Sequence, residues 1–281
     1  MKIQDKVCLV TGGARGIGRA LAIGFAGSGA KAVVICDIDL EKAEETGVAV
    51  REAGAQALVL DCDVSEEAPI RRAVAQAERQ FGAVDVMAQN AGFGYSDKPG
   101  WTVASQTNEQ WDMQWRVNVM AHVWGVRAAL PGMLARGSGY FLNTVSAAGL
   151  ITQVGDAAYA TTKHAAIGFA ESLAITHGEQ GIGVSVLCPQ GVRTRLIELE
   201  EIVTKSVGVD GIREPEEVAA ASIEAIDEGR FLVLPHPETL DYLRRKTADY
   251  DRWISGMRRF RRMLFPSDDI MDPGPSPSLS D

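Results

Sequence analysis

The sequence predicts an α/β fold, a doubly wound domain whose seven-stranded parallel sheet carries helices on both faces. Seven short runs rich in Val, Ile and Leu are almost continuously apolar, which is typical of strands buried on both faces. The stretches between these runs carry helical periodicity, as the right-handed crossovers of a parallel sheet require. A glycine-rich turn directly follows the first run, where such sheets approach a ligand.

The expected strands divide the chain into three parts. In chain order they are VCLVT near residue 7, AVVICD near 32, ALVLD near 57, VDVMAQN near 84, YFLNTV near 140, VSVLC near 184 and FLVL at 231. Residues 1–235 contain no linker or internal repeat, so we expect one domain there. Residues 236–265 are expected to form a C-terminal helical extension. Residues 266–281, rich in Pro, Ser and Asp, are expected to form a disordered tail.

Composition excludes several classes of protein. The 281 residues are 46% hydrophobic and carry a net charge of −9, which is typical of a soluble globular protein and argues against a nucleic-acid partner. We find no candidate for an integral membrane segment and no secretory pattern at the N-terminus, so a cytoplasmic protein is expected. Four cysteines lie in or beside apolar runs without metal-binding spacing, so we expect free thiols and no metal site. They are Cys8, Cys36, Cys62 and Cys188.

The glycine turn predicts a dinucleotide site of the Rossmann type. Its glycines let the backbone and a helix N-terminus approach a pyrophosphate closely. The candidate contacts are Gly12, Arg15, Gly16, Ile17 and Gly18. Asp37 ends the second strand about 20 residues later, where a carboxylate binds ribose hydroxyls and would repel a 2′-phosphate. NAD is therefore favoured over NADP, although the basic Arg15 keeps NADP open.

A second group of residues predicts acid–base chemistry. Tyr159 and Lys163 are four residues apart in a helical segment, so their side chains project from one face. A nearby ammonium stabilises a phenolate, so we expect Lys163 to lower the pKa of Tyr159. Ser146 follows the strand YFLNTV, at the sheet edge that normally presents ligand groups.

Taken in order, these motifs resemble the short-chain dehydrogenase/reductase family over residues 1–235. The glycine turn has the family's TGxxxGxG pattern, and Ser146, Tyr159 and Lys163 form its Ser…Tyr-x-x-x-Lys set. Further matches are Asp63-Val64 for the adenine-contacting pair, Asn90-Ala91-Gly92 for the NAG motif and Asn118 for the helix asparagine. The resemblance implies that all of these residues belong to the cofactor and catalytic sites.

The resemblance also implies roles for the catalytic residues. Tyr159 would exchange a proton with the substrate oxygen, and Ser146 would hydrogen-bond that oxygen. Lys163 would hold the nicotinamide ribose, and Asn118 would support a water chain that relays the proton to solvent.

One loop departs from the family's pattern. The family's P-G-x-V-x-T loop corresponds to residues 189–194, so Pro189, Val192 and Thr194 are further cofactor candidates, the last two for the nicotinamide carboxamide. Gln190 replaces the family's glycine, and two interpretations of it stay open. Its side chain either faces solvent or places an amide in the substrate pocket.

The substrate pocket is expected to be apolar. By resemblance, residues 195–212 occupy the position of a substrate-covering helix and loop, with Leu150 and Ile151 opposite. The predicted pocket residues are Ala148, Leu150, Gln190 and Leu196. An apolar or cyclic secondary alcohol, or its ketone, is therefore the expected substrate.

The expected function is that of an NAD(H)-dependent oxidoreductase interconverting a secondary alcohol and a ketone, similar to secondary-alcohol and hydroxyprostaglandin-type dehydrogenases. An NADPH-dependent carbonyl or 3-oxoacyl reductase is the enzymatic alternative. A catalytically silent dinucleotide-binding sensor or scaffold is the alternative from another class. Family members assemble through the helices bearing the counterparts of Asn118 and Tyr159, so a homodimer or homotetramer is expected.

The extension differs in charge from the rest of the chain. Residues 240–265 contain eight basic and three acidic residues, with apolar residues such as Trp253, Met257 and Phe260 at helical spacing. This pattern predicts one basic amphipathic helix. We expect it to dock on its own acidic domain or on a neighbouring subunit, with contact to an anionic membrane or polyanion as the alternative.

Overall fold

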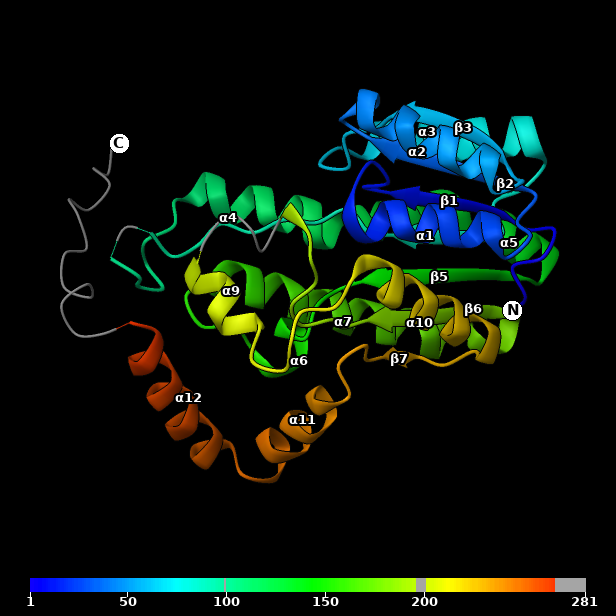
Figure 1. The fold of residues 1–281 in the computed structure, drawn as a ribbon. Helices are drawn as coiled ribbons and strands as arrows, with labels where there is room; N and C mark the ends of the chain where they lie inside the picture. The colour runs from blue at the N-terminus through cyan, green and yellow to red at the C-terminus, as the bar shows by residue number, and fades with distance from the viewer. Residues whose placement is uncertain (99, 196–200, 266–281) are drawn as a thin grey trace, which may run out of the picture.

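A computed structural model describes residues 1–98, 100–195 and 201–265 of the chain, and the segment expected to be disordered, 266–281, lies outside them (Figure 1). The described strands form one parallel sheet in the order β3-β2-β1-β4-β5-β6-β7. They are β1 Val7–Thr11, β2 Ala32–Asp37, β3 Gln56–Asp61, β4 Val86–Gln89, β5 Gly139–Thr144, β6 Ile182–Leu187 and β7 Leu232–Val233. The predicted doubly wound, seven-stranded parallel sheet is confirmed.

The helices cover both faces of this sheet (Figure 1). Those of the domain are α1 Gly16–Gly27, α2 Leu40–Glu52, α3 Glu67–Phe81, α4 Asn108–Trp115, α5 Ala121–Arg136, α6 Ala148–Ile151, α7 Ala157–His177, α9 Glu201–Val207 and α10 Pro215–Glu228. A π-helix, η1 Arg116–Met120, joins α4 to α5, and a short 3₁₀ helix, η2 Gly178–Gln180, follows α7. The described helices are too short or too polar to cross a membrane.

Two hydrophobic cores sandwich the sheet. Along β1, Val7 and Leu9 pack into the core beneath α3, α5 and α7, whereas Cys8 and Val10 pack into the core beneath α1, α2 and α10. Successive residues of a strand face opposite sides, so a continuously apolar strand supplies both cores. The four cysteines are buried and free, as expected.

The strand order places the functional edge. β1 lies between β2 and β4, so the connections after β1 and β4 leave the sheet in opposite directions. Ligands of doubly wound folds bind in the crevice that opens at such a point, outside the carboxyl ends of the strands. The glycine turn follows β1, and the Asn90 motif follows β4, so both border this crevice.

The C-terminal extension consists of two helices instead of the one helix predicted over 240–265. They are α11 Glu238–Ala248 and α12 Tyr250–Leu264. At Asp249 the backbone is extended (φ −157°, ψ 96°), and the side chain caps α12 by accepting a hydrogen bond from the Arg252 backbone N–H at 2.9 Å. Aspartate favours this capping position over a helix interior, which explains why the helix breaks there.

The extension packs on its own domain, beside α6 and α9 (Figure 1). Lys246 of α11 donates to the Leu150 carbonyl at 2.7 Å. At the far end, Arg261 donates to the Trp101 carbonyl at 2.9 Å, and the Phe265 ring lies 4.6 Å from the Trp101 ring. Both helices are therefore attached near the carboxyl edge of the sheet.

Candidate active site

The glycine turn is tied to the end of β4. The Thr11 hydroxyl accepts hydrogen bonds from the backbone N–H groups of Asn90 (3.0 Å) and Ala91 (3.2 Å). The Asn90 amide in return donates to the carbonyls of Thr11 and Gly12, both at 3.2 Å. These four hydrogen bonds therefore hold the loops after β1 and β4 against each other.

The turn leaves no room for side chains at its glycines. A Cβ at Gly18 would lie 2.0 Å from the Gly12 carbonyl oxygen, and one at Gly12, where φ is +64°, would lie 2.9 Å from the Ala91 Cα. Gly16 has φ +51° and faces Thr194, whose methyl group would lie 2.9 Å from an added Cβ. Such a bare backbone at the start of α1 fits the pyrophosphate of a dinucleotide.

A cavity of about 230 Å³, here called the glycine-edge cavity, lies against this turn. It is lined by Gly12, Arg15, Gly16, Ile17, Asn90, Ala91, Gly92, Thr144, Val145, Ser146, Tyr159, Lys163, Pro189, Gln190, Val192, Thr194 and Arg195. Most of the residues predicted to bind a cofactor therefore meet in one place. The predicted residues outside this lining are Gly18, which packs behind the turn, and Asp37, Asp63 and Val64 near the ends of β2 and β3.

The carboxylate of Asp37 is fixed at the end of β2. It accepts hydrogen bonds from the backbone N–H groups of Ala14 (2.9 Å) and Asp39 (3.0 Å). Arg15 is paired with Asp39 at 2.6 Å, and this guanidinium holds the pKa of the Asp39 carboxyl below its usual value. Arg15, the residue that kept NADP open, is therefore already neutralised by an acid.

The second acidic motif is also held locally. The Asp63 carboxylate accepts from the Ser65 backbone N–H at 2.8 Å, and the Val64 side chain is buried.

Asn118 is held rigidly beneath the cavity. It lies in the π-helix η1, is completely buried, and its amide donates to the Phe93 carbonyl (2.9 Å) and to the Thr162 hydroxyl (3.1 Å). Its amide oxygen accepts from the Phe93 backbone N–H at 3.2 Å. Single π-turns inside helices are often found at functional sites.

Lys163 is a buried lysine next to Asn118. Its side chain is 2% exposed and donates to the Thr144 carbonyl at 3.4 Å. A Cβ at Gly92 would lie 3.1 Å from the Lys163 Nζ and 3.2 Å from the Asn118 Oδ1, so this glycine lets both groups approach the cavity. Burial lowers the pKa of Lys163 to about 8.

Tyr159 and Ser146 form a pair at the cavity wall. Both line the glycine-edge cavity, and the Ser146 hydroxyl accepts from the Ala148 backbone N–H at 3.1 Å. Desolvation raises the pKa of Tyr159 above its usual value, and the Ser146 hydroxyl offsets part of that rise. The expected net lowering of this pKa is therefore wrong: the Lys163 ammonium lies 5.3 Å from the Tyr159 ring centroid, and burial of the phenol outweighs its stabilising effect on the phenolate.

Gln190 joins this site to the extension. Its side-chain amide donates to the Asp210 carboxylate (2.8 Å) and to the Thr239 hydroxyl of α11 (3.0 Å). Its backbone N–H donates to the His236 ring at 3.2 Å. Of the two interpretations left open, the structure favours the pocket, because Gln190 is half-buried and lines the glycine-edge cavity.

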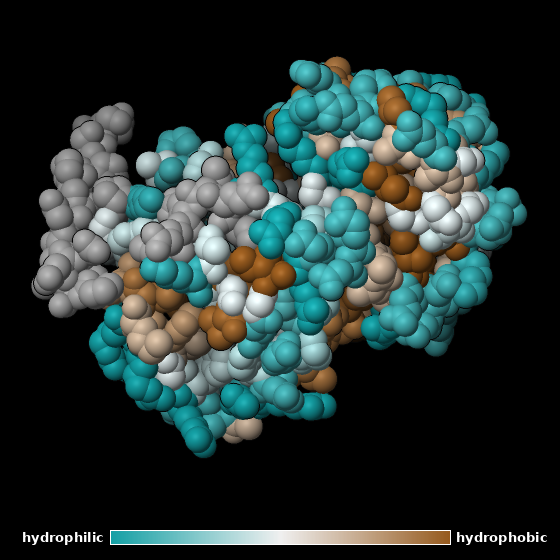
Figure 2. Space-filling view, in the orientation of Figure 1, coloured by the Kyte–Doolittle hydropathy of each residue, from teal (hydrophilic) through white to brown (hydrophobic). Residues whose placement is uncertain are grey.

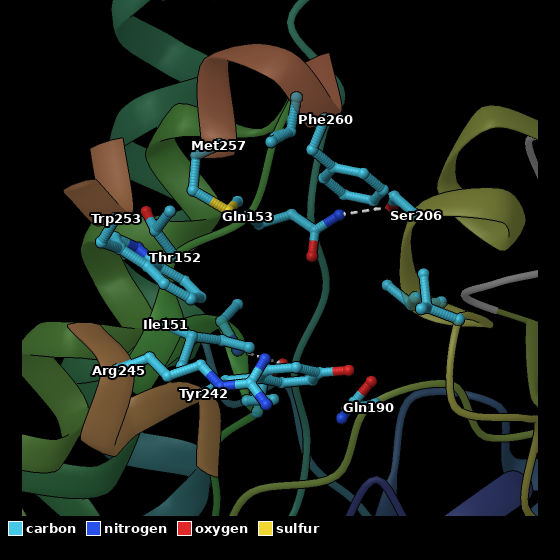
Figure 3. Close-up of a pocket in the computed structure, with 16 residues that line it drawn as sticks. Ile151, Thr152, Gln153, Gln190, Ser206, Tyr242, Arg245, Trp253, Met257 and Phe260 are labelled. Carbon is cyan, nitrogen blue, oxygen red and sulfur yellow. Dashed lines mark hydrogen bonds between the residues drawn. The ribbon is translucent and has the colours of Figure 1, made fainter. Parts of the chain in front are cut away.

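A second cavity of about 260 Å³, here called the apolar cavity, adjoins the first (Figure 3). It is lined by Ser146, Ala147, Ala148, Ile151, Thr152, Gln153, Val154, Gln190, Ser206, Val207, Val209, Tyr242, Arg245, Trp253, Met257 and Phe260. Ser146 and Gln190 line both cavities. A Gln153–Ser206 hydrogen bond of 2.6 Å crosses one side of the apolar cavity (Figure 3).

The structure brings two of the predicted pocket residues to the apolar cavity. Ala148 and Gln190 line the apolar cavity, but Leu150 does not, because its side chain packs against the domain core while the next residue, Ile151, faces the cavity. Leu196 lies outside the described residues.

Sequence reasoning missed the cavity residues of the extension. One wall of the apolar cavity is formed by Tyr242, Trp253, Met257 and Phe260. The last three recur at helical spacing, which is the only sequence pattern that could have pointed to them. That spacing indicates a buried face without indicating that the face borders a pocket.

Comparisons with known proteins agree with this geometry. Residues 6–201 match the family model described as short chain dehydrogenase. The chain is 33% identical to a 1-deoxy-11-beta-hydroxypentalenate dehydrogenase of Streptomyces exfoliatus, over 91% of this chain and 92% of that protein. It is 32% identical to epidermal retinol dehydrogenase 2 of Mus musculus, over 83% of this chain and 75% of that protein.

A solved structure is similar as well. A short-chain dehydrogenase/reductase from Burkholderia phymatum, crystallised in complex with NAD, superimposes with a TM-score of 0.80 at 29% sequence identity. The match covers 89% of this chain and 96% of the other.

Proposed function

The chain belongs to the short-chain dehydrogenase family of oxidoreductases, and we propose that it interconverts a secondary alcohol and a ketone with NAD(H). The observation that carries this proposal is the position of Ser146. It lines both cavities, and Tyr159 lines the glycine-edge cavity with it, so a substrate oxygen bound at the junction can reach both hydroxyls. The glycine-edge cavity then takes the dinucleotide, and the apolar cavity takes the body of the substrate.

The four residues have distinct chemical tasks in this proposal. When bound, the nicotinamide group supplies or accepts the hydride. Tyr159 donates a proton to the ketone oxygen, for which its raised pKa keeps it in the protonated form, and Ser146 hydrogen-bonds the same oxygen. The Lys163 ammonium, 5.3 Å from the ring centroid, stabilises the phenolate that remains. In the oxidative direction Tyr159 takes the proton back.

Asn118 and Lys163 provide the route by which the proton is replaced. Both are buried beside Gly92, and Asn118 is fixed by three hydrogen bonds to Phe93 and Thr162. We assign Asn118 a positioning role, in which it supports a water chain between Lys163 and solvent.

The acidic surroundings of β2 support NAD over NADP. Asp37 is fixed where the adenosine ribose of a Rossmann ligand binds, and Arg15 is occupied by Asp39. A 2′-phosphate would meet these carboxylates without a free arginine to bind it. Steady-state rates with the two cofactors at equal concentration test this preference, and faster turnover with NADPH would favour the carbonyl reductase alternative.

The apolar cavity and the relatives support an apolar or cyclic substrate. Ile151, Val154, Val207, Met257 and Phe260 line the cavity. The relatives described above are named for a pentalenate derivative and for retinol, both of which are largely hydrocarbon. A panel of secondary alcohols tests this point, and turnover restricted to strongly charged polyols would contradict it.

We also propose that the protein forms a homodimer or homotetramer through α4, α5 and α7. The support for this interface is the exposure of large apolar side chains on these helices: Trp115 (41%) and Met113 (41%) on α4 and Ile175 (84%) on α7. Contact with a second subunit would remove this apolar surface from water. Sedimentation of the purified chain would measure the state.

The Tyr159→Phe variant tests the catalytic assignment. General acid–base groups contribute about 10²- to 10⁴-fold, so we expect kcat to fall by that factor while the affinity for NAD stays nearly unchanged. Tyr95→Phe is the matched control, because Tyr95 is near the site in sequence but lines neither cavity. Substantial turnover by purified Tyr159→Phe would overturn the assignment.

A further inference from the structure

Arg245 is an unusual member of the apolar cavity. It is the one charged side chain among the described residues that line the cavity, whose other members are apolar or neutral. It comes from α11, and its guanidinium lies over the Tyr242 ring with its Cζ 5.8 Å from the ring centroid (Figure 3). Stacking of this kind holds the planar guanidinium while its N–H groups stay available.

Within the described part of the chain, no acid pairs with Arg245. The contrast with its neighbour is direct, because Arg244 is ion-paired with Asp241 at 3.2 Å. Asp210 accepts hydrogen bonds at both oxygens from cavity residues, namely Gln190 (2.8 Å) and the Tyr242 hydroxyl (2.9 Å). Asp249, which lines the adjoining hollow, caps α12 by accepting from the Arg252 backbone N–H. Arg245 is therefore an exposed cation that lines an apolar cavity, and no described acid forms an ion pair with it.

A second hollow of about 460 Å³ adjoins the apolar cavity. It shares Arg245, Trp253 and Met257 with that cavity, and its charged members besides Arg245 are Asp249, Arg252 and Arg259. The surface around α11 and α12 is mixed: hydrophilic residues predominate at its outer rim (Figure 2), while Ile254 and Met263 of α12 are also exposed. Three arginines against one aspartate give the lining of this hollow a net positive charge, which attracts anions.

We propose that the substrate carries a carboxylate on its apolar body and that Arg245 binds this carboxylate. The inference rests on the proposed function, because it places the reacting hydroxyl at Ser146 and Tyr159 and the carboxylate elsewhere in the same cavity. A guanidinium matches a carboxylate with two parallel hydrogen bonds, which makes arginine selective for this group. The volume of about 260 Å³ lies near the lower end of known ligand pockets, so the body is a small ring system.

The test compares acids with their methyl esters. The probes are hydroxycyclohexane carboxylates and hydroxydecahydronaphthalene carboxylates, each with the ester that removes the charge and keeps the ring. We expect the wild type to prefer at least one acid over its ester by about 10- to 100-fold in kcat/KM, which is the usual contribution of a charged hydrogen bond. Equal or better use of every ester would overturn the proposal.

Variants locate the effect. Arg245→Met should remove the preference by raising KM for the acid while leaving the ester unchanged, and Arg245→Lys should restore part of it. Arg244→Met is the matched control, because Arg244 is on the same helix and lines neither cavity. Loss of acid and ester turnover to the same extent in Arg245→Met would mean a structural role only and would overturn the proposal.

A binding measurement separates this inference from the proposed function. Cyclohexane carboxylate and decahydronaphthalene carboxylate have no hydroxyl, so calorimetry with the NAD-loaded protein reports the carboxylate site without turnover. Binding to the wild type but not to Arg245→Met supports the site even where no alcohol is oxidised. Absence of binding overturns it even where neutral alcohols are good substrates. Added salt should weaken binding of the acids and leave ester turnover unchanged.

Discussion

The two cavities that meet at Ser146 are built from different parts of the chain. The glycine-edge cavity is formed by loops that directly follow β1, β4, β5 and β6 and by Tyr159 and Lys163 of α7. Hydrogen bonds between the side chains and backbone of Thr11 and Asn90 hold two of these loops together. The apolar cavity takes one wall from α6 and the residues after it and the opposite wall from α11 and α12, which lie about a hundred residues further along the chain.

This difference separates the proposed binding of NAD from the proposed binding of the substrate. The glycine-edge cavity lies at the ends of the sheet strands, so a substitution there also disturbs the folded domain. The wall that α12 supplies to the apolar cavity is carried by an appended helix, which can change its side chains without touching the sheet. Gln190 is the link between the two, since it lines both cavities and is hydrogen-bonded to Thr239 of α11.

Removing the extension gives the largest expected effect. A chain ending at Leu234 loses Trp253, Met257 and Phe260 from the apolar cavity. At about 1 kcal/mol for each of these half-buried side chains, kcat/KM should fall by about 100-fold or more. NAD affinity, measured by calorimetry, should change little. Unchanged kinetics would contradict the role of the extension.

A point substitution can also separate substrate use from NAD binding, without shortening the chain. Trp253→Ala should weaken substrate use but not NAD binding, whereas Ile254→Ala, on the exposed neighbour, should alter neither. Equal effects of the two variants on KM would contradict the assignment of Trp253 to the cavity wall.

A substitution in the glycine turn should instead weaken the binding of NAD. Gly18→Ala places a Cβ 2.0 Å from the Gly12 carbonyl oxygen, so the turn must shift. We expect NAD affinity to fall by about 100-fold, since such overpacking costs about 1 to 3 kcal/mol. Gly27→Ala, at the other end of α1, meets no atom within 4 Å and is the control. If a folded Gly18→Ala protein bound NAD as tightly as the wild type does, the assignment of the glycine turn to the cofactor site would be wrong.

The smallest effect concerns stability and pH. Burial lowers the pKa of Lys163 to about 8, below the 10.5 of an exposed lysine. The unfolded chain therefore binds more protons between these values, so wild-type stability should rise with pH through that window, and below it the full cost of burying the charge remains.

Lys163→Met removes this cost together with the ammonium to which we assign a catalytic role. In protein without added cofactor, chemical denaturation at pH 7 should show an unfolding free energy higher by about 2 kcal/mol, and the gain should shrink as pH approaches 10.5. A variant that is less stable than the wild type at pH 7 would mean that Lys163 is a net structural contributor.

Much of the fold and of the glycine-edge cavity follows from sequence alone. Strand residues such as Val7 to Val10 are apolar without interruption because both faces are buried, and that pattern is local. Gly12, Gly16 and Gly18 are readable because their backbone conformation or close contacts exclude other residues. The expected pKa of Tyr159 was wrong because the degree of burial, which decides it, has no local signature.

The sequence by itself determined the sheet, the dinucleotide cradle and the spacing of Ser146, Tyr159 and Lys163, because each depends on local periodicity or backbone sterics. Only the tertiary structure decided that the helix breaks at Asp249, that Ile151 instead of Leu150 faces the cavity, and that α12 forms its wall. An amphipathic pattern states that one face of a helix is buried. What covers that face depends on contacts between residues distant in the chain, which no local pattern records.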